Sequence, residues 1–142
     1  MNLKFLDLPL LILSFSFAGC SVPNLESPQC TQSRDAVREF YSIHFGNEMK
    51  PSEAYLKLRK QYITENFSNV ISKQINQSQD FFTLTDDYGK AFRIGKCKDV
   101  EQNKTDLEVL IFWKTDTRTE QKAIHAEAVN EGGKWLINKI EN

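Results

Sequence analysis

The sequence contains few of the residues from which metal sites and nucleophilic active sites are built. Its 142 residues include two histidines and three cysteines. No pair of cysteines has the Cys-x-x-Cys spacing of a zinc site or a redox centre. There is no Gly-x-Ser-x-Gly nucleophile motif and no glycine-rich phosphate loop. We therefore expect neither a bound metal nor a cofactor.

The charges show no excess of either sign. The chain has 18 basic and 19 acidic residues, for a net charge of −1, without a basic stripe or an acidic tail. Nucleic acid is not an expected partner, because binding to its phosphates requires clustered Lys and Arg. The apolar content of 40% and the charged content of 26% are typical of a globular protein. The length is enough for one domain with a modest core.

A hydrophobic run long enough to span a bilayer is also missing. The apolar stretch at residues 8–18 is too short for that, but it has the length of the apolar part of a signal peptide. It ends in Phe17-Ala18-Gly19-Cys20, which resembles the lipobox of bacterial lipoproteins. The match departs at Phe17, where the family prefers Leu. An ordinary secretory signal with a coincidental cysteine, or a buried helix, are the alternatives.

The lipobox resemblance implies a membrane anchor and a location. In lipoproteins the cysteine sulfur receives a diacylglycerol, a peptidase cuts before this residue, and the new amino group is acylated. Residues 1–19 would then be a signal peptide and Cys20 the lipidated first residue, held stably to the membrane by three acyl chains. In bacteria with two membranes, an Asp at the position of Ser21 often retains lipoproteins in the inner membrane, so Ser21 implies the outer membrane in such a bacterium. Residues 20–30, with Pro23 and Pro28, would form a tether.

The two remaining cysteines are expected to form a disulfide. If Cys20 carries the lipid, Cys30 and Cys97 remain, and an exported protein meets an oxidising compartment. A bond between them would connect the first helix to a strand. Two unrelated thiols are the alternative.

Three helices are expected in the first half of the mature chain. Ser33 is a candidate N-cap for the first helix, and Gly46 would end it in a left-handed turn. Thr64 would cap the third helix, and residues 76–90 are polar and turn-rich. The expected inward residues are Val37, Phe40, Tyr41 and His44 in the first helix, Ala54, Leu58 and Tyr62 in the second, and Phe67, Val70, Ile71 and Ile75 in the third.

From residue 91 the hydrophobic period changes to two, which predicts strands. Four are expected, at residues 91–97, 106–114, 122–129 and 134–140, joined by short turns into an antiparallel meander. The second is apolar on both faces, as a central strand would be. One face of the second strand carries Leu107, Val109, Ile111 and Trp113, and one face of the third carries Ile124, Ala126 and Ala128. Helices followed by strands predict an α+β fold.

This order of elements resembles the nuclear transport factor 2-like superfamily over residues 31–142. The stretches that carry the resemblance are DAVREFYSIHF, LKLRKQYITENFSNVI and the closing GGKWLINKIEN, in which Gly133, Trp135 and Ile137 match a Gly-x-Trp-x-Ile ending. The resemblance implies three amino-terminal helices packed against a curved antiparallel sheet of about four strands. It implies little about function, since members include isomerases, dehydratases, hydrolases and lipoproteins of unknown function.

The candidates for a pocket are individual residues, because no acid–base motif of the superfamily is present. His125 and Glu127 lie two residues apart on one side of a predicted strand, where they could support acid–base chemistry if they faced a cavity. A solvent-exposed face is the alternative. In the cone-shaped fold of this superfamily, Tyr41 would lie near the mouth of the cone. Trp113 could form an exposed aromatic patch. Both residues also fit a packed core.

The function expected from these features is recognition in the cell envelope. A tether, a disulfide-bonded domain and the lack of a catalytic constellation favour a noncatalytic binding module for an envelope protein or a small ligand. An immunity lipoprotein that neutralises a toxin is a specific form of this hypothesis. The alternatives are a cavity enzyme of the isomerase or hydrolase type and a structural protein of envelope assembly.

Overall fold

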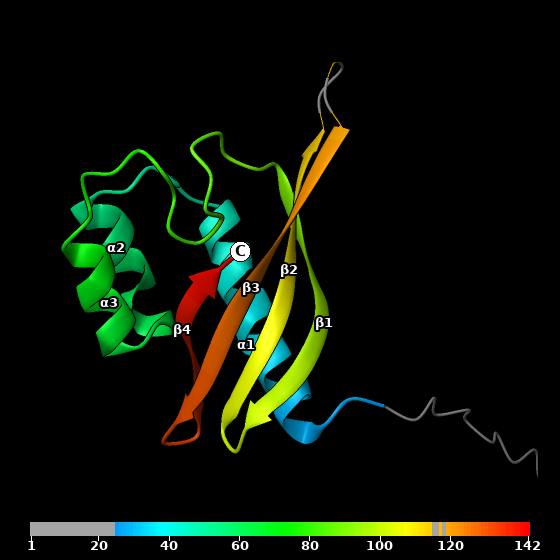
Figure 1. Cartoon of the computed structure of the whole chain (residues 1–142). Coiled ribbons are helices and arrows are strands. Elements are labelled where there is room, and N and C mark those ends of the chain that lie inside the picture. The colour runs from blue at the N-terminus through cyan, green and yellow to red at the C-terminus, as the bar shows by residue number, and fades with distance from the viewer. Residues whose placement is uncertain (1–24, 115–116, 118) are drawn as a thin grey trace, which may run out of the picture.

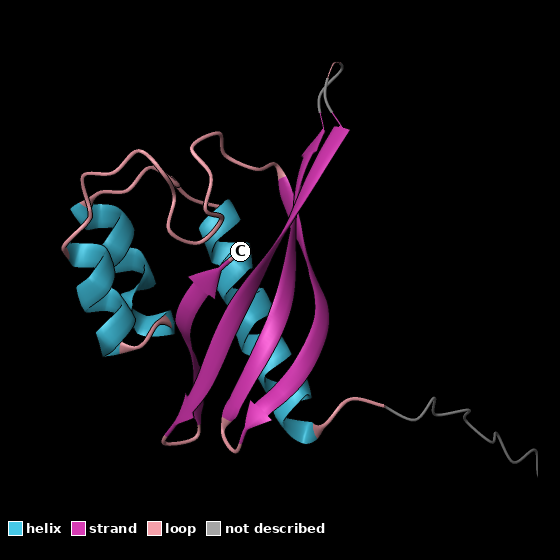
Figure 2. Ribbon diagram, in the orientation of Figure 1, coloured by secondary structure: helices cyan, strands magenta, loops and turns pink. Residues whose placement is uncertain are grey.

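One open sheet and one long helix form the framework of the structure (Figures 1 and 2). The computed structural model describes residues 25–114, 117 and 119–142. In this part of the chain, three α-helices and a short 3-10 helix precede an antiparallel sheet with the strand order β1-β2-β3-β4. The elements are α1 Pro28–Phe45, α2 Glu53–Arg59, η1 Lys60–Tyr62, α3 Glu65–Ser72, β1 Ala91–Glu101, β2 Lys104–Lys114, β3 Thr119–Glu131 and β4 Lys134–Glu141. The predicted α+β class is confirmed.

Helix α1 begins earlier than the sequence pattern predicts. Ser27, and not Ser33, is the N-cap, because its Oγ accepts a hydrogen bond from the backbone N–H three residues later at 3.0 Å. Pro28 occupies the first turn, where its missing N–H costs nothing. Residues 28–30 therefore belong to the helix and not to a tether. At the other end Gly46 has φ −83°, so the predicted left-handed turn is wrong.

The inward face of α2 also differs from the predicted one. Tyr55 and Arg59 are buried, with 3% and 0% of their surface exposed. Ala54 and Leu58, which were expected to face the core, are exposed, and Tyr62 is half-buried. An arginine is an unexpected core residue because burying its charge is costly unless contacts compensate it. Those contacts come from other elements and are described below.

Helix α3 matches its prediction more closely. Thr64 is its N-cap, and its hydroxyl accepts a hydrogen bond from the N–H of Phe67 at 3.2 Å. Phe67 and Ile71 are buried as expected. Val70 is 44% exposed, and Ile75, beyond the end of the helix, is half-buried.

The sheet contains the four predicted strands, each extended by pairing that continues into the turns. Strand β2 lies between β1 and β3, as its two apolar faces predict. The predicted inward side chains are all buried, namely Leu107, Val109, Ile111 and Trp113 of β2 and Ile124, Ala126 and Ala128 of β3. The β3–β4 hairpin turns through Gly132 and Gly133, whose φ values of 62° and 91° suit glycine best.

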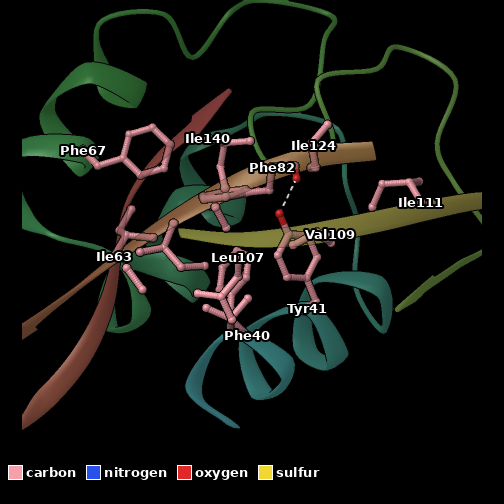
Figure 3. Close-up of a cluster of buried hydrophobic side chains, with 14 of the residues drawn as sticks. Phe40, Tyr41, Ile63, Phe67, Phe82, Leu107, Val109, Ile111, Ile124 and Ile140 are labelled. Carbon is pink, nitrogen blue, oxygen red and sulfur yellow. Dashed lines mark hydrogen bonds between the residues drawn. The ribbon is translucent and has the colours of Figure 1, made fainter. Parts of the chain in front are cut away.

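Large aromatic side chains fill the space between α1 and the sheet (Figure 3). Phe40, Tyr41 and Phe82 have 0% exposed surface, and the rings of Phe40 and Phe82 lie 4.6 Å apart. Burial of each such side chain contributes roughly 1.5–3 kcal/mol to stability. The interior of the cone is therefore a packed core that joins α1, the sheet and the segment between α3 and β1.

Candidate functional site

The two predicted acid–base residues lie on the outer face of the sheet. Alternate residues of β3 face the core, so His125 and Glu127 point to the opposite side. Nδ1 of His125 lies 2.8 Å from Oδ2 of Asp106 on the neighbouring strand, and both side chains are partly exposed. Glu127 instead accepts a hydrogen bond from Nδ2 of Asn138 at 2.7 Å. The two residues therefore share a face but have separate partners.

A surface hollow of about 290 Å³ lies beside His125. It is lined by Lys96, Cys97, Lys98, Asp106, Glu108 and His125. Two carboxylates and two ammonium groups stand around it, so its charges are nearly balanced. In the described part of the chain, no group of three or more His, Cys, Asp and Glu side chains is placed to hold a metal ion.

Tyr41 and Trp113 lie on the other side of the sheet, in the core. The hydroxyl of Tyr41 donates to the carbonyl oxygen of Phe82 at 2.7 Å (Figure 3), and the indole N–H of Trp113 donates to the carbonyl oxygen of Asp87 at 2.8 Å. The four residues proposed from the sequence therefore do not line a common pocket. The sheet separates them, because His125 and Glu127 point outward from β3 whereas Trp113 of β2 and Tyr41 of α1 lie on the core side.

A second cluster of functional groups is buried between α1, α2 and the segment that precedes β1. It contains His44 of α1, Tyr55 and Arg59 of α2, and Asp80 and Thr83 of that segment, and we call these five residues the polar network. Nε of Arg59 donates to Nδ1 of His44 at 2.7 Å, and Nε2 of His44 lies 2.9 Å from Oδ2 of Asp80. Asp80 also accepts hydrogen bonds from the hydroxyls of Tyr55 and Thr83, both at 2.6 Å.

Backbone carbonyl groups complete the surroundings of Arg59. Its Nη1 donates to the carbonyl oxygen of Tyr55 at 3.0 Å, and its Nη2 donates to the carbonyl oxygens of Glu48 and His44 at 3.0 and 3.4 Å. The Cζ atom lies 4.0 Å from the centre of the Tyr55 ring, a distance at which a cation is attracted to the ring face. These contacts explain how a cation can occupy the inner face of α2.

The geometry fixes the protonation states of the network near neutral pH. Arg59 has no acceptor, so Nδ1 of His44 must accept and Nε2 carries the hydrogen that is donated to Asp80. Burial lowers the pKa of His44 below its ordinary value of 6.5; the contact with Asp80 opposes this shift, and the charge of Arg59 adds to it. Burial alone would raise the pKa of Asp80, but hydrogen bonds from His44, Thr83 and Tyr55 outweigh it and lower the pKa below 3.8. The neutral imidazole of His44 therefore connects the Arg59 cation to the Asp80 anion.

The polar network is sealed from solvent in this conformation. His44, Arg59, Asp80 and Thr83 have 0% exposed surface. Burial and the charge of Asp80 raise the pKa of Tyr55, which stays a hydrogen-bond donor. The arrangement therefore joins three segments that are distant in sequence.

Sequence reasoning missed this network, although two of its features are visible in the sequence. Tyr55 and Arg59 are four positions apart and so share a helix face. Asp80 stands directly before two phenylalanines, where a carboxylate would be drawn toward the core. Neither feature identifies the partners, since His44 and Asp80 are 36 positions apart.

The disulfide expected from the sequence is present, and it fixes the start of α1 to β1. Cys30 and Cys97 are joined with a Cα–Cα distance of 5.8 Å. Beside this bond, the hydroxyl of Ser27 donates to Asp99 at 2.8 Å. Cys20, the predicted lipidation site, lies outside the described residues. Within those residues, no helix is both long enough and apolar enough to cross a membrane.

Comparisons with known proteins detect similarity in structure. A scan against protein-family models finds no match, and a search of the curated proteins finds none either. Among solved structures, the potential transfer protein TraM of the Gram-positive conjugative plasmid pIP501, described as Ntf2-like, is 15% identical, with a TM-score of 0.51 over 79% of this chain and 94% of that chain. The chain has a nuclear transport factor 2-like fold.

Two further structures share this arrangement. One is a protein of unknown function from Bacteroides thetaiotaomicron, with 17% identity and a TM-score of 0.58 over 80% of this chain and 91% of that chain. The other is a chain of the type VI effector–immunity complex Tae3–Tai3 from Ralstonia pickettii, with 12% identity and a TM-score of 0.59 over 76% of this chain and 92% of that chain. At these identities the similarity concerns the fold alone.

Proposed function

We propose that this protein is a noncatalytic protein-binding module, attached to the outer membrane of a bacterium through a lipid on Cys20. The packed interior carries this proposal, because Phe40, Tyr41 and Phe82 fill the space that the fold could otherwise offer to a small substrate. Recognition then takes place at the surface. One of the similar structures comes from a complex of an effector with its immunity protein, and this similarity supports a role in protein recognition.

The attachment point favours one end of the domain for the partner. The start of α1 lies beside the β1–β2 turn (Figure 1), where the N–H of Asn103 donates to the side-chain oxygen of Gln29 at 2.6 Å. Arg34 is paired with Glu26 and donates to the carbonyl oxygen of Gly95 at 2.6 Å. A membrane anchor before residue 25 would hold this end toward the bilayer. Helices α2 and α3 would then be free to meet another protein.

A hollow between α2 and α3 gives the proposal a specific surface. This α2–α3 groove has a volume of about 330 Å³ and is lined by Glu53, Leu56, Lys57, Lys60, Ser72 and Ile75. Leu56 and Ile75 provide an apolar floor, while two lysines and one glutamate stand around it. An aliphatic side chain flanked by carboxylates on a partner protein would complement this combination of shape and charge.

A quantitative crosslinking pull-down would test the proposed interaction. The tagged protein, bound to the membranes of its own cells, is compared with Lys57→Glu/Lys60→Glu and with the control Lys90→Glu, which reverses an exposed charge outside the groove. We expect one envelope protein to be enriched by the native protein and the control and lost with the double variant. Equal recovery by all three proteins would place the interaction elsewhere, and no enriched protein would contradict the binding module.

The anchor has a separate test. We expect Cys20→Ala to leave the precursor uncut and without palmitate label, because both lipidation and the cut before Cys20 require its sulfur. Cys30→Ala, which removes a cysteine outside the lipobox, should still be labelled. Labelling and normal processing of Cys20→Ala would contradict lipidation at this residue.

An acid–base function on the outer face is the second candidate. The contact at 2.8 Å between His125 and Asp106 orients the imidazole beside a hollow, as an acid–base catalyst requires. An activity found with a panel of hydrolase and isomerase substrates should be lost in His125→Ala and kept in the control Lys90→Ala, which removes an exposed charge outside the hollow. An envelope-assembly role has less support, since the exposed large apolar residues of the described chain, Leu25, Leu58, Val70 and Val100, lie on separate segments.

A further inference from the structure

The hydrogen bond between Arg59 and His44 can exist only while His44 is neutral. Nδ1 of His44 accepts from Nε of Arg59 at 2.7 Å, and a guanidinium group keeps its protons at any ordinary pH. A proton on Nδ1 would turn the acceptor into a donor that faces another donor on a cation. The same proton would strengthen the bond to Asp80, because an imidazolium donates to a carboxylate with the help of charge. Protonation therefore favours one partner of His44 and repels the other.

We propose that the contact between Arg59 and His44 is an acid-sensitive latch, in which a proton taken up at Nδ1 of His44 releases α2 from the carboxyl-terminal end of α1. The segment around Asp80 stays attached to His44 in the released state. The proton comes from the solvent. Apart from the new N–H bond at Nδ1, no covalent bond forms or breaks. This device is independent of which partner the domain binds.

The surroundings of α2 allow it to move without disrupting the sheet. The helix has seven residues, and hollows of about 330 and 210 Å³ lie along it. Its inward side chains are Tyr55 and Arg59, both members of the polar network. Besides Nε of Arg59, α2 is held by Nη2 of Arg59 on the carbonyl oxygen of His44 at 3.4 Å, by the hydroxyl of Tyr55 on Asp80 at 2.6 Å and by Leu56, which packs against the core. Release of α2 therefore requires the repulsion at Nδ1 of His44 to displace the Arg59 side chain and the Tyr55 hydroxyl together.

The groups around His44 determine the pH at which the latch responds. The charged groups are Arg59 of α2, which disfavours the proton, and Asp80, which favours it. The titratable neighbours are Tyr41 of α1 and Tyr55 of α2, whose rings lie 6.1 and 6.0 Å from the imidazole. Burial raises the pKa of both phenols, so they stay neutral. Asp80 is therefore the single neighbour in this set that attracts the proton.

The direction of the pH dependence follows from these surroundings. The pKa of His44 lies below 6.5 in the closed state, whereas release of Arg59 removes one cause of that shift and admits water. The open state therefore binds the proton more readily, and opening increases as the pH falls. One proton can raise the opening constant by at most about tenfold per pH unit. Hydrogen bonds lower the pKa of Asp80 below its ordinary value of 3.8, so Asp80 keeps the charge that favours the proton on His44.

A strained turn lies beside the network, in the segment that carries Asp80. Leu84 has φ 54°, a left-handed conformation that is unfavourable in a residue with a branched side chain. Its turn is closed by the N–H of Asp80, which donates to the carbonyl oxygen of Thr85 at 2.8 Å. On the core side of α2, the ring of its Tyr55 lies 5.8 Å from the ring of Phe82. Release of α2 would therefore uncover an apolar surface in acid that is closed at neutral pH.

Hydrogen exchange read by mass spectrometry tests the latch on the full-length protein. Exchange is measured at pH 7.5 and 5.0 and corrected for the intrinsic effect of pH. The matched variant is His44→Gln, whose amide can donate to Asp80 and accept from Arg59 but cannot titrate. We expect opening of α2 to increase by about tenfold or more in the native protein and to stay nearly constant in His44→Gln. Peptides from β2 should remain protected in both.

A second measurement keeps the test independent of how well the variant folds. The ¹⁵N shifts of the His44 ring in the native protein report which nitrogen carries hydrogen. We expect the Nε2–H tautomer at pH 7.5 and an imidazolium that appears together with the opening of α2. The latch is refuted if His44 stays neutral while α2 opens, if His44→Gln shows the same pH dependence, or if β2 opens together with α2.

Discussion

Replacement of Asp80 by asparagine is the sharpest perturbation of the polar network. The carboxylate accepts from Tyr55 at 2.6 Å and from the N–H of Phe82 at 3.4 Å on one oxygen, and from Thr83 at 2.6 Å and His44 at 2.9 Å on the other. An amide group has to place its NH₂ at one of these two positions. Either choice leaves an N–H group, of Phe82 or of His44, facing another donor. The substitution therefore breaks the network while keeping the size and shape of the side chain.

The expected cost has two parts. A buried donor without its acceptor costs about 1–3 kcal/mol. Loss of the carboxylate charge also leaves the Arg59 cation buried without the counter-charge that it reaches through His44. This is comparable to the removal of one member of a buried ion pair, which costs about 3–5 kcal/mol in total. We expect Asp80→Asn to lower the free energy of unfolding by about 3–5 kcal/mol, out of the roughly 5–15 kcal/mol of a typical domain.

Urea denaturation at pH 7.5, followed by circular dichroism without reductant, measures this cost. The control is Asp86→Asn, an exposed carboxylate in the same segment, which should change stability by no more than about 0.5 kcal/mol. In Asp80→Asn/Arg59→Met the buried charge is also removed, so we expect a cost smaller than the sum of the single variants by at least about 1 kcal/mol. A loss below about 1 kcal/mol in Asp80→Asn, or simple additivity, would refute the electrostatic coupling.

Two further predictions concern β1. Cys30 and Cys97 are separated by 67 positions. In the chain-entropy model, changing both to serine should therefore lower the free energy of unfolding, measured in urea, by about 4 kcal/mol. A loss below about 1 kcal/mol would show that other contacts already order the start of α1. A methyl group at Gly95 would collide with the carboxylate of Glu108. In a Glu108→Ala background, Gly95→Ala should therefore raise the free energy of unfolding by about 0.4–1 kcal/mol. In the native background the same change should raise it less, or lower it. The same thermal shift in both backgrounds would contradict this contact.

The sheet and its core could be predicted from the sequence because their signal is local. A period of two places Leu107, Val109 and Ile111 on one face wherever the strand lies, and burial of that face follows from their chemistry. The cap at Thr64 is equally local, since its hydroxyl needs the N–H groups of the next turn. Tyr41 was correctly predicted to belong to the inward aromatic face of α1, but it does not line a pocket.

The start of α1, the inner face of α2 and the polar network could not be predicted in the same way. Pro28 was interpreted as part of an extended tether because proline resists the interior of a helix, yet the first turn of a helix accepts it. Arg59 was not among the residues expected to face the core, and an isolated guanidinium is costly to bury. Its burial depends on Nδ1 of His44, 15 positions away, and on Asp80 beyond that. A local pattern contains no information about such partners.

Two different kinds of chemistry therefore hold the two ends of α1. At its start the disulfide from Cys30 connects the helix to β1, and this bond is insensitive to protons across the physiological range. At its other end His44 connects the helix to Asp80 and, through a hydrogen bond that requires a neutral imidazole, to Arg59 of α2. A molecule that was anchored before α1 would thus have a permanently closed end next to the membrane and a conditionally closed end away from it. Acid would act on the surface that we propose for a partner and leave the attachment unchanged.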